Sequence, residues 1–558
     1  MGGTCDEPDA DQVWDAAIGK SVLTAIRWKP VKSIEPEPVD ISGARGERQQ
    51  VLNHRRRIIF NDDTYEMCRE DANTPEGYLS RRLQPLVGTH VDTISWSVLG
   101  GWADAPVYDS KVQPVFGPAH GGPPNLWSPY TARNLRQLIE SGNDPLQVVI
   151  DFAHGNGMEL FASVRMNDCH DSFLPAGVTL WKKEHPEFLV DRGNISSDRN
   201  AHHMGLYVIA QDFSHREVRD RKFEIIQEVC RRYDIDGIDL NFMRHPVFFS
   251  RTMRGEPASD TEIEIMNELL RRIRRCTDEE GTRRGKPILV AAIVPDSPQL
   301  ALNVGLDVKS WCQEDLIDIL IPGLGYAPFT EPVAEFVELA HPHDVKVFPC
   351  INRKAPQHID EAHLSEGFRG ATSNWYHMGA DGVFFWNLGT PLEGMSGDDL
   401  VVTRSRYYNS LTELGDRAKL QSLDKLFGVD DQVLSYYDHV TSDRPLPLTV
   451  SDGDPASVSF YVGDDVSARG DELEELRLVL IFRGTGDQEL LEVRLNGHEL
   501  SGGKVVRSDT DYLKMMYLPE AEQIELGPNT LTARLKTALD TDADPIQLDR
   551  VRLWVEYK

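Results

Sequence analysis

Long apolar segments are missing from this 558-residue sequence, because no stretch approaches the roughly 20 uninterrupted apolar residues that a transmembrane helix requires. The N-terminal segment MGGTCDEPDADQVWD is acidic and lacks the apolar core of a signal peptide. We therefore expect no membrane partner. As the sequence stands the protein is predicted to be cytoplasmic, and a signal peptide removed earlier would make it periplasmic or secreted.

Cysteine is also scarce, with seven residues that are dispersed, odd in number and without CxxC spacing. This pattern is typical of reduced thiols and excludes a disulfide scaffold or a cysteine-based zinc site. Basic residues are outnumbered too, with 59 Lys and Arg against 89 Asp and Glu and a net charge of -30. Such an acidic protein is not expected to have nucleic acid as its partner.

Several catalytic motifs are absent as well. The sequence has no GxSxG nucleophile elbow and no cysteine in a helix-opening motif, so hydrolysis by a serine or cysteine nucleophile has no support. It also has no Gly-rich phosphate loop. No cofactor is predicted.

From about residue 55, segments typical of strands alternate with segments typical of helices. Thr74-Pro75 predicts the start of a helix that runs to about Leu86, and a capping box of Ser214 and Glu217 predicts another that runs to Arg232. Eight strands over about 350 residues favour a parallel sheet closed into a (β/α)₈ TIM barrel over an open doubly wound sheet. The predicted strands cover 57–61, 90–98, 158–168, 236–242, 288–296, 318–326, 346–353 and 381–388.

The pattern changes after about residue 430, where short segments of alternating polarity predominate. Asn496-Gly497 lies between two such segments and is a strong hairpin signal. We predict a C-terminal β-sandwich of the jelly-roll kind. The predicted domains are an unassigned N-terminal extension at 1–50, a catalytic (β/α)₈ barrel at 51–428 and a β-sandwich at 429–558.

The predicted fourth strand, within YDIDGIDLNFMRHPVFF, carries polar residues where a buried strand should be apolar. In a barrel Asp239 and Asn241 would point inward near the mouth, with Arg244 and His245 on the loop above them. A buried carboxylate without partners is costly, so this arrangement needs either a substrate or an internal ion pair between Asp239 and an arginine. Both interpretations are open at this point.

Other predicted strands also end in polar or aromatic residues, and the carboxyl ends of barrel strands meet at one mouth. Their joint position predicts a single pocket. The residues concerned are Asn61, Asp62, Asp63, Arg165, Asn167, Asp168, His170, Asp296, Tyr326, Asn352, Arg353, Trp386 and Asn387.

Acid–base chemistry on a sugar needs two carboxyl groups, one to protonate the leaving oxygen and one to activate water or attack carbon. Asp239 and Asp296 lie on neighbouring predicted strands and are the predicted catalytic pair, with Asp168 in reserve. The tryptophans Trp386, Trp102 and Trp96 could stack on sugar rings or belong to the core.

The arginines Arg165, Arg244 and Arg353 indicate either an anionic group on the substrate or a balance to the site's own aspartates. A divalent metal site is the alternative interpretation of this region, since it contains suitable ligand types in Asp62, Asp168, His170, Asp239, His245 and Asp296. Because HExxH spacing is missing, no metal is predicted.

The run GIDLNFMRHP, with WKKEHPEFLV and RRIIFNDD upstream, resembles the glycoside-hydrolase-like barrels called family-10-like, over roughly residues 55 to 400. The C-terminal part looks like the galactose-binding-like sandwich that accompanies many such barrels. The resemblance implies a carbohydrate-active barrel with Asp239 as the strand-four carboxylate and Arg244 and His245 at the mouth. The chain departs from the pattern in having Cys350-Ile351-Asn352-Arg353 where a glutamate nucleophile is usual, and Asn241 where relatives have a second acid.

These observations predict a glycoside hydrolase that acts on an oligo- or polysaccharide, neutral or anionic. The alternatives are a metal-dependent carbohydrate lyase or isomerase and a non-catalytic glycan-binding protein. The sequence is compatible with a homo-oligomer and does not give the oligomeric state. The predicted substrate-binding residues are Asp62, Arg165, Asn167, Asp168, Asn241, Arg244, His245, Tyr326, Asn352, Arg353 and Trp386.

Overall fold

The structure, a computed structural model, describes residues 37–100, 104–117, 130–173, 178–190, 205–352, 363–387, 405–430, 435–442, 444–484, 491–508, 512–537 and 545–558. Two predicted site residues, Arg353 and Trp102, lie outside the described residues. None of the helices in the described ranges has the length and apolar character needed to cross a membrane.

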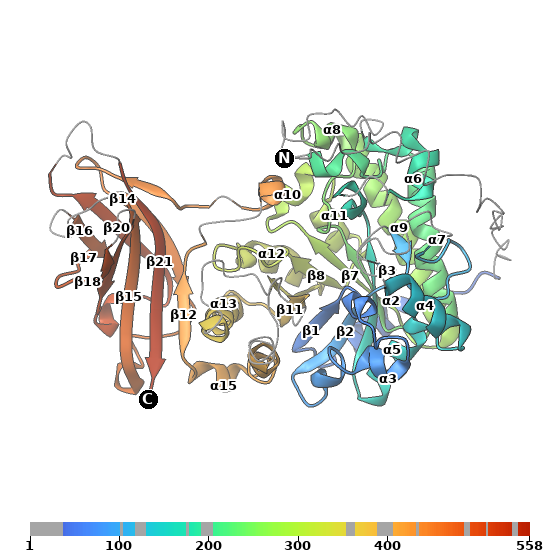
Figure 1. Cartoon of the computed structure of the whole chain (residues 1–558), viewed down its shortest axis with the longest axis horizontal. Helices are drawn as coiled ribbons and strands as arrows, with labels where there is room; N and C mark the ends of the chain where they lie inside the picture. Colours follow the sequence, from blue (N-terminus) through green and yellow to red (C-terminus); the bar gives the residue numbers. More distant parts are fainter. Residues whose placement is uncertain are drawn as a thin grey trace, which may run out of the picture.

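A parallel sheet of nine strands occupies the centre of the larger part of the molecule (Figure 1). All eight predicted strands are present, and the seventh is divided at Phe348-Pro349 into two short strands. The sheet order is β10-β11-β1-β2-β5-β6-β7-β8-β9. The strands are β1 (Ile58–Asp62), β2 (Val91–Ser97), β5 (Glu159–Arg165), β6 (Gly237–Asn241), β7 (Leu289–Val294), β8 (Ile319–Pro322), β9 (Lys346–Val347), β10 (Cys350–Asn352) and β11 (Val383–Trp386).

The two edges of this sheet are consecutive in the chain, since β9 and β10 are separated by two residues. The Phe348 N–H donates to the Leu320 carbonyl at 2.9 Å, on the β8 side. The Phe384 N–H, on β11, donates to the Pro349 carbonyl at 2.9 Å. Proline has no N–H for a ladder, so the break at Pro349 marks where the segment changes partners.

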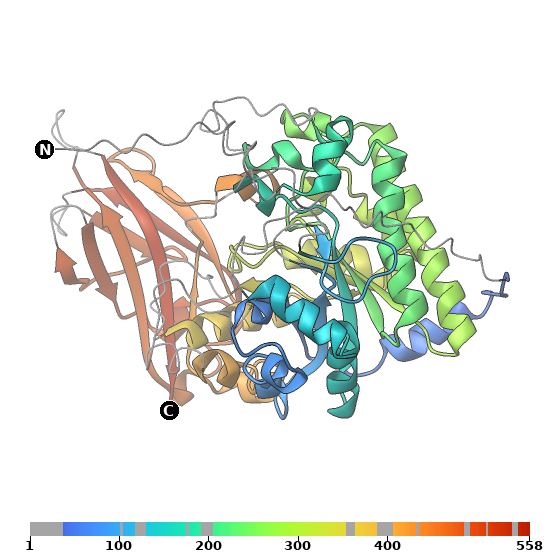
Figure 2. The same ribbon diagram turned by 45° about the vertical axis from the view of Figure 1, so that its right-hand side comes forward.

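Helices lie around the sheet, as Figures 1 and 2 show from two directions. The strands are buried along almost their whole length, which explains the continuous apolar runs in the sequence. The longer helices are α2 (Ala44–Leu52), α4 (Thr131–Glu140), α5 (Pro145–Gly155), α7 (Arg216–Arg232), α9 (Asp260–Arg284), α12 (Val333–Ala340) and α13 (Leu364–His377).

Two predicted helix starts can be compared with the structure. Thr74 caps α3 (Pro75–Leu79) by accepting the Gly77 N–H at 3.1 Å, but the helix ends well before Leu86. The predicted capping box of Ser214 is wrong, because α7 starts at Arg216 with no side-chain cap. The Ser214 N–H instead donates to Asp212 at 2.9 Å, so the residue belongs to the preceding turn.

The C-terminal part contains two antiparallel sheets whose apolar side chains form one core. The predicted hairpin at Asn496-Gly497 joins β16 to β17, and both turn residues have positive φ. One sheet contains β12 (Lys425–Gly428), β13 (Leu448–Val450), β15 (Leu473–Arg483), β18 (Lys504–Ser508), β19 (Tyr512–Tyr517) and β21 (Ile546–Tyr557). The other contains β14 (Ala456–Val462), β16 (Leu491–Leu495), β17 (His498–Glu499) and β20 (Gly527–Leu535).

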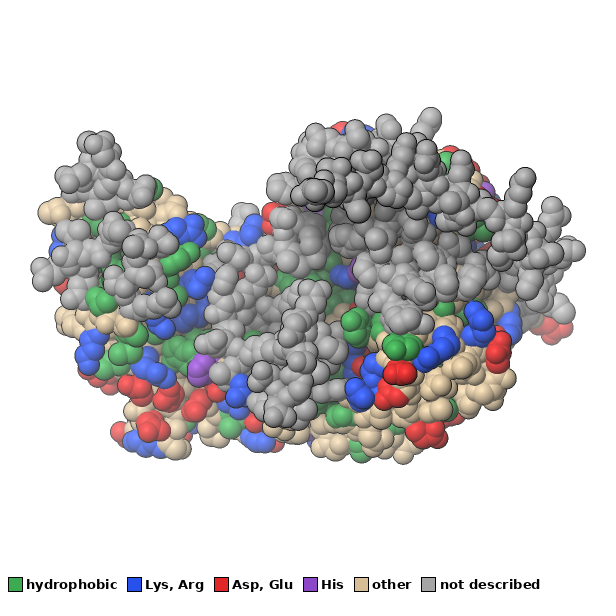
Figure 3. Space-filling model, viewed as in Figure 1, with side chains coloured by type: hydrophobic (Ala, Val, Ile, Leu, Met, Phe, Trp, Pro, Cys, Tyr) green, Lys and Arg blue, Asp and Glu red, His purple; other side chains and the backbone are tan. Residues whose placement is uncertain are grey.

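This part packs against the larger one through β12, which lies along α13 (Figure 1). The chain then leaves β12, returns to the parallel sheet as the short 3-10 helix η11 (Ser435–Val440) beside α10 (Pro298–Asn303), and goes back to β13. On the face seen in Figure 3, acidic side chains along the lower edge of the C-terminal sheets are interspersed with basic ones.

Candidate functional site

Asp239 lies within β6, fully buried, with Ser163 of β5 and Ala291 of β7 beside it in register. The Ser95 hydroxyl donates to its Oδ2 at 2.6 Å, and its Oδ1 has no partner among the described residues. Burial raises the pKa of Asp239 to about 7, although the hydroxyls of Ser95 and Ser163 lower it. The alternative of an ion pair between Asp239 and an arginine is not found within the described ranges.

Asn241 ends β6 and is also fully buried. Neither its amide oxygen nor its amide nitrogen has a hydrogen-bond partner in the part of the chain that the structure describes. Unpaired polar atoms inside a protein are costly and call for water or a ligand. Asp239 and Asn241 are therefore candidates for hydrogen bonds to a substrate.

Asp296 lies two residues beyond β7, the strand next to β6. Its carboxylate accepts the Ser442 N–H at 2.8 and 3.0 Å and the Ser442 hydroxyl at 3.0 Å. Burial raises the pKa of Asp296 to about 6, against the effect of these hydrogen bonds. Asp296 lines a small cavity of about 10 Å³ together with Tyr326, Glu331 and Tyr437, among others.

The segment that follows β12 therefore reaches the carboxyl ends of the strands. The Tyr437 hydroxyl donates to the Arg244 carbonyl at 3.0 Å and accepts from the Arg244 guanidinium at 3.0 Å. The rings of Tyr437 and Tyr326 stack with 5.6 Å between their centroids. Two predicted site residues, Arg244 and Tyr326, are thus held by a segment that the sequence analysis assigned to a separate domain.

A second cluster of charges lies at the ends of β1 and β5. The buried Arg165 binds Asp168 at 2.7 Å and Asp63 at 3.0 Å, while Arg82 lies 3.4 Å from Asp62. Burial raises the pKa of Asp62 to about 6 and outweighs the charge of Arg82. Arg165 is therefore already balanced by aspartates of the protein itself.

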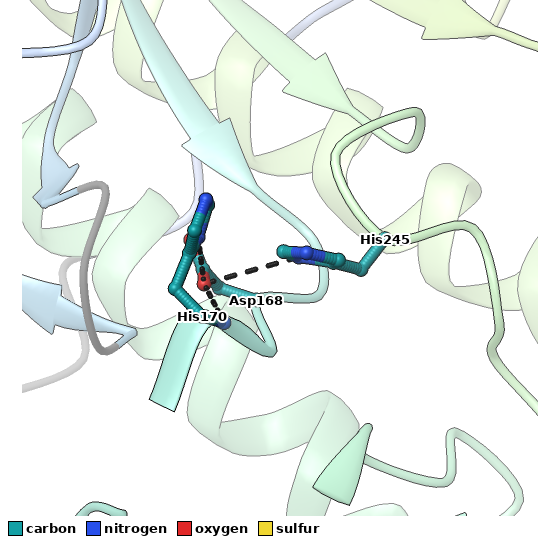
Figure 4. A group of neighbouring side chains, drawn as sticks. All are labelled: Asp168, His170 and His245. Atoms are coloured by element: carbon teal, nitrogen blue, oxygen red, sulfur yellow. Dashed lines mark hydrogen bonds and ion pairs between the residues drawn. The ribbon is translucent and has the colours of Figure 1, made fainter. Parts of the chain in front are cut away.

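Asp168 also joins two histidines, as Figure 4 shows. Its Oδ1 lies 2.7 Å from His170 Nδ1 and 3.8 Å from His245 Nδ1, and the latter nitrogen accepts the Cys169 N–H at 3.0 Å. Burial lowers the pKa of His170 to about 4 and that of His245 well below its ordinary value, so both rings are neutral at pH 7. Burial alone would raise the pKa of Asp168, but His170 and Arg165 hold it well below its usual range.

The same three side chains offer one ligand atom each within 4.8 Å of one another, which is the spacing of a metal site. Each of them is already engaged: Asp168 by Arg165, His170 by the guanidinium of Arg244, and His245 by a backbone N–H. A cation here would face two guanidinium groups. The chemistry of the cluster fits a hydrogen-bonded network better than a metal centre.

The remaining predicted residues have mixed surroundings. Asn167 bridges two loops, since its amide nitrogen donates to the carbonyls of Gln211 and Val247 at 3.1 and 2.7 Å. Asn352 and Trp386 end β10 and β11 and are buried. Trp96 is a core residue whose indole N–H donates to Tyr78 at 2.8 Å.

Sequence reasoning missed Glu331, Tyr437 and Ser442, although all three belong to the surroundings of Asp296. Glu331 is followed by Pro332 in the loop before α12 and looks like an ordinary polar loop residue. Only its position shortly after a predicted strand could have drawn attention to it. Ser442 and Tyr437 carry no local signal, because they lie more than a hundred residues from Asp296 in the sequence.

Comparison with known proteins agrees with the predicted resemblance. Residues 125–252 match the family model GHL10, described as glycosyl hydrolase-like 10. This match includes β5 and β6 and confirms the glycoside-hydrolase-like character of that segment. No curated protein matches the chain significantly.

Solved structures similar to this chain include several glycosidases. An alpha-L-fucosidase isoenzyme 2 from Paenibacillus thiaminolyticus is 15% identical over 64% of this chain, with a TM-score of 0.38, and the match spans about half (49%) of that protein. A family GH18 chitinase from Chromobacterium violaceum is 11% identical over 87% of this chain and 89% of its own, with a TM-score of 0.33. An endo-beta-1,4-mannanase double mutant from Cellulomonas fimi is 11% identical over 91% and 97%, with a TM-score of 0.31. None of these scores supports an assignment of substrate.

Proposed function

We propose that the protein is a glycoside hydrolase, with a (β/α)₈ barrel from about residue 51 and a C-terminal β-sandwich to which β12 (Lys425–Gly428) already belongs. The observation that carries the proposal is the pair Asp239 and Asp296. Both carboxyl groups are buried, neither has a cationic partner among the described residues, and they come from neighbouring strands of the parallel sheet. Ligands of parallel α/β folds bind at the carboxyl ends of the strands.

Two carboxyl groups of this kind suit the hydrolysis of a glycosidic bond. One gives a proton to the leaving oxygen, and the other accepts a proton from the attacking water or attacks the anomeric carbon. The pKa of Asp239 is about 7 and that of Asp296 about 6, so each group can change protonation near neutral pH. General acid–base catalysis is most effective with groups in this range.

The surrounding residues support a neutral glycan as substrate. Arg165 forms ion pairs with Asp63 and Asp168, so its charge is already balanced. The guanidinium of Arg244 is hydrogen-bonded to Tyr437 and His170. The buried amide of Asn241 is a group that hydrogen-bonds sugar hydroxyls. Tyr326 and Trp386 complete the proposed binding surface with aromatic rings.

A combined binding and product assay tests the proposal. The wild type and the Asp296→Asn variant are screened on a glycan array, and the soluble glycans bound are then incubated with each protein and analysed by chromatography. We expect binding by both proteins and shorter products from the wild type alone. Binding without any product would mean a glycan-binding protein, and unsaturated products would mean a lyase; either result overturns the proposal.

A further inference from the structure

Glu331 is a buried acid of this region that has no stabilising partner in the part of the chain that the structure describes. It lies in the loop between β8 and α12, is 4% exposed and lines the same small cavity as Asp296. No ion pair or side-chain hydrogen bond of Glu331 occurs among the described residues, and its Oε1 is buried and unpaired. An unpaired carboxyl group in such surroundings is far more stable with a proton than without one.

The backbone beside Glu331 leaves space for this carboxyl group. Gly323, which follows β8, has a φ of +74° and lies against it. A Cβ atom at Gly323 would come within 3.1 Å of Glu331 Oε1. A glycine there permits the close approach, and other residues would be strained in that conformation as well.

Asp296, in the same cavity, has opposite surroundings. Ser442 supplies it with a backbone N–H and a hydroxyl, both of which favour the ionised carboxylate. Two carboxyl groups share one cavity, and among the described residues hydrogen-bond donors reach only Asp296. Such a difference in environment separates the roles of an acid and a base.

We infer that Glu331 and Asp296 act as a carboxyl pair, in which Glu331 is the proton donor and Asp296, held by Ser442, is the ionised partner. The inference rests on the proposed function and adds a catalytic residue to it. As the glycosidic C–O bond breaks, the Glu331 proton passes to the leaving oxygen. Water adds to the anomeric carbon and gives its proton to Asp296, so the sum is hydrolysis with no net proton change. Asp239 then stabilises positive charge that develops on the sugar.

The other groups facing Glu331 agree with this assignment. Burial raises the pKa of Glu331 well above its ordinary value, and the charges of Asp296 and Asp430 raise it further. Asp430 accepts the N–H groups of Phe329 and Thr330 at 2.6 and 3.0 Å. The thiol of Cys350 is also close enough to interact, and burial raises the pKa of that thiol too. The cavity is also lined by Tyr326 and Tyr437.

The test compares Glu331→Gln with Asp296→Asn on glycosides that differ only in the leaving group. A glutamine has the shape of a protonated glutamate but no proton to give. We expect Glu331→Gln to lose at least about 10²-fold in kcat/KM on natural glycans and to retain most activity on dinitrophenyl glycosides, whose leaving group needs no acid. Asp296→Asn should lose activity on both. Glu335→Gln, on the exposed face of α12, serves as the control.

Equal losses of Glu331→Gln on both kinds of glycoside, or no loss, would overturn the inference and leave Asp239 as the donor. Infrared difference spectra of wild type minus Glu331→Gln give a second readout that requires no turnover. A protonated carboxyl band at pH 7.5 is expected in the wild type alone. If no glycoside is hydrolysed, the proposed function fails, and the infrared band still tests the carboxyl pair. Presence of the band would show that Glu331 is protonated beside Asp296. Absence of the band would overturn the pairing of the two carboxyl groups.

Discussion

Asp239 is a buried acid with no counter-charge among the described residues, and this has consequences for stability. Its pKa of about 7 in the folded protein lies above the 3.8 expected in the unfolded chain. Between these values the folded state keeps a proton that the unfolded state releases, so stability must fall as pH rises from about 4 to about 7. A group kept at such a cost is typical of a functional site.

The first prediction concerns Asp239→Asn. The amide cannot ionise, so the variant should nearly match the wild type at pH 3.5 and exceed it at pH 8, by up to about 4 kcal/mol for a shift of about three pKa units. Urea unfolding at both pH values measures the difference, and Asp454→Asn, on an exposed loop, is the control. A variant less stable than the wild type at pH 8 would show that Asp239 has a structural role.

The second prediction concerns the cluster of Asp168, His170 and His245. Because Arg165 and Arg244 already occupy two of these side chains, we expect no dependence on a divalent ion. Exhaustive dialysis against a chelator should leave the melting temperature and any glycosidase activity unchanged. Loss of either, with recovery on addition of one particular metal ion, would favour the metal-dependent alternative.

At the scale of the element, η11 (Ser435–Val440) and the residues just after it connect the two parts of the molecule at the site. Ser442 binds Asp296, and Tyr437 binds Arg244. The chain leaves the C-terminal sheets and returns to them between β12 and β13 to make these contacts. The charge state of Asp296 therefore depends in part on a segment outside the parallel sheet.

The third prediction follows for Ser442→Ala. Removing the hydroxyl takes one hydrogen bond from the Asp296 carboxylate, so the pKa of Asp296 should rise above about 6. The acid limb of the pH profile of kcat/KM should then move to higher pH, with little change in the melting temperature. Ser422→Ala makes the same change at an exposed position outside the cavity and should move nothing. An unchanged acid limb in Ser442→Ala would show that the ionisation of Asp296 does not cause that limb.

The elements themselves could be predicted well from the sequence, and the site only in part. Strands buried on both faces leave continuous apolar runs, so all eight could be predicted, and the polar interruption at Asp239 predicted a functional site on β6. The predicted cap of α7 at Ser214 was wrong, because Ser214 belongs to the turn before the helix and its N–H donates to Asp212. Glu331 and Ser442 could not be found, since their roles depend on burial and on contacts between distant segments, which leave no local pattern.

At the scale of the whole molecule, a buried polar cluster joins the two parts. Asp464 lies 2.7 Å from the ammonium group of the buried Lys425, and it accepts the Tyr557 hydroxyl at 2.6 Å and the hydroxyl of Ser373 on α13. Asn374, the next residue on α13, donates to the Tyr461 carbonyl at 3.2 Å and accepts the Gly463 N–H at 2.7 Å. The C-terminal sheets are thus fixed to the helix layer.

The fourth prediction is that Asp464→Asn destabilises the protein strongly. It leaves the Lys425 ammonium group buried without a counter-charge, and breaking a buried pair in this way typically costs about 3–5 kcal/mol. Thermal unfolding should show a clear fall in melting temperature. Glu472→Gln removes an exposed ion pair with Arg469 and should change nothing measurable. Equal melting temperatures for Asp464→Asn and the wild type would mean that the interface contributes little.

The central claim is that carboxyl groups at the mouth of the parallel sheet hydrolyse a glycan. The most direct measurement is the release of sugar from a broad panel of polysaccharides and aryl glycosides by the wild type and by Asp239→Asn, each with and without chelator. We expect release by the wild type alone, at the same rate in chelator. Release by both proteins, or by neither on any member of the panel, would contradict it.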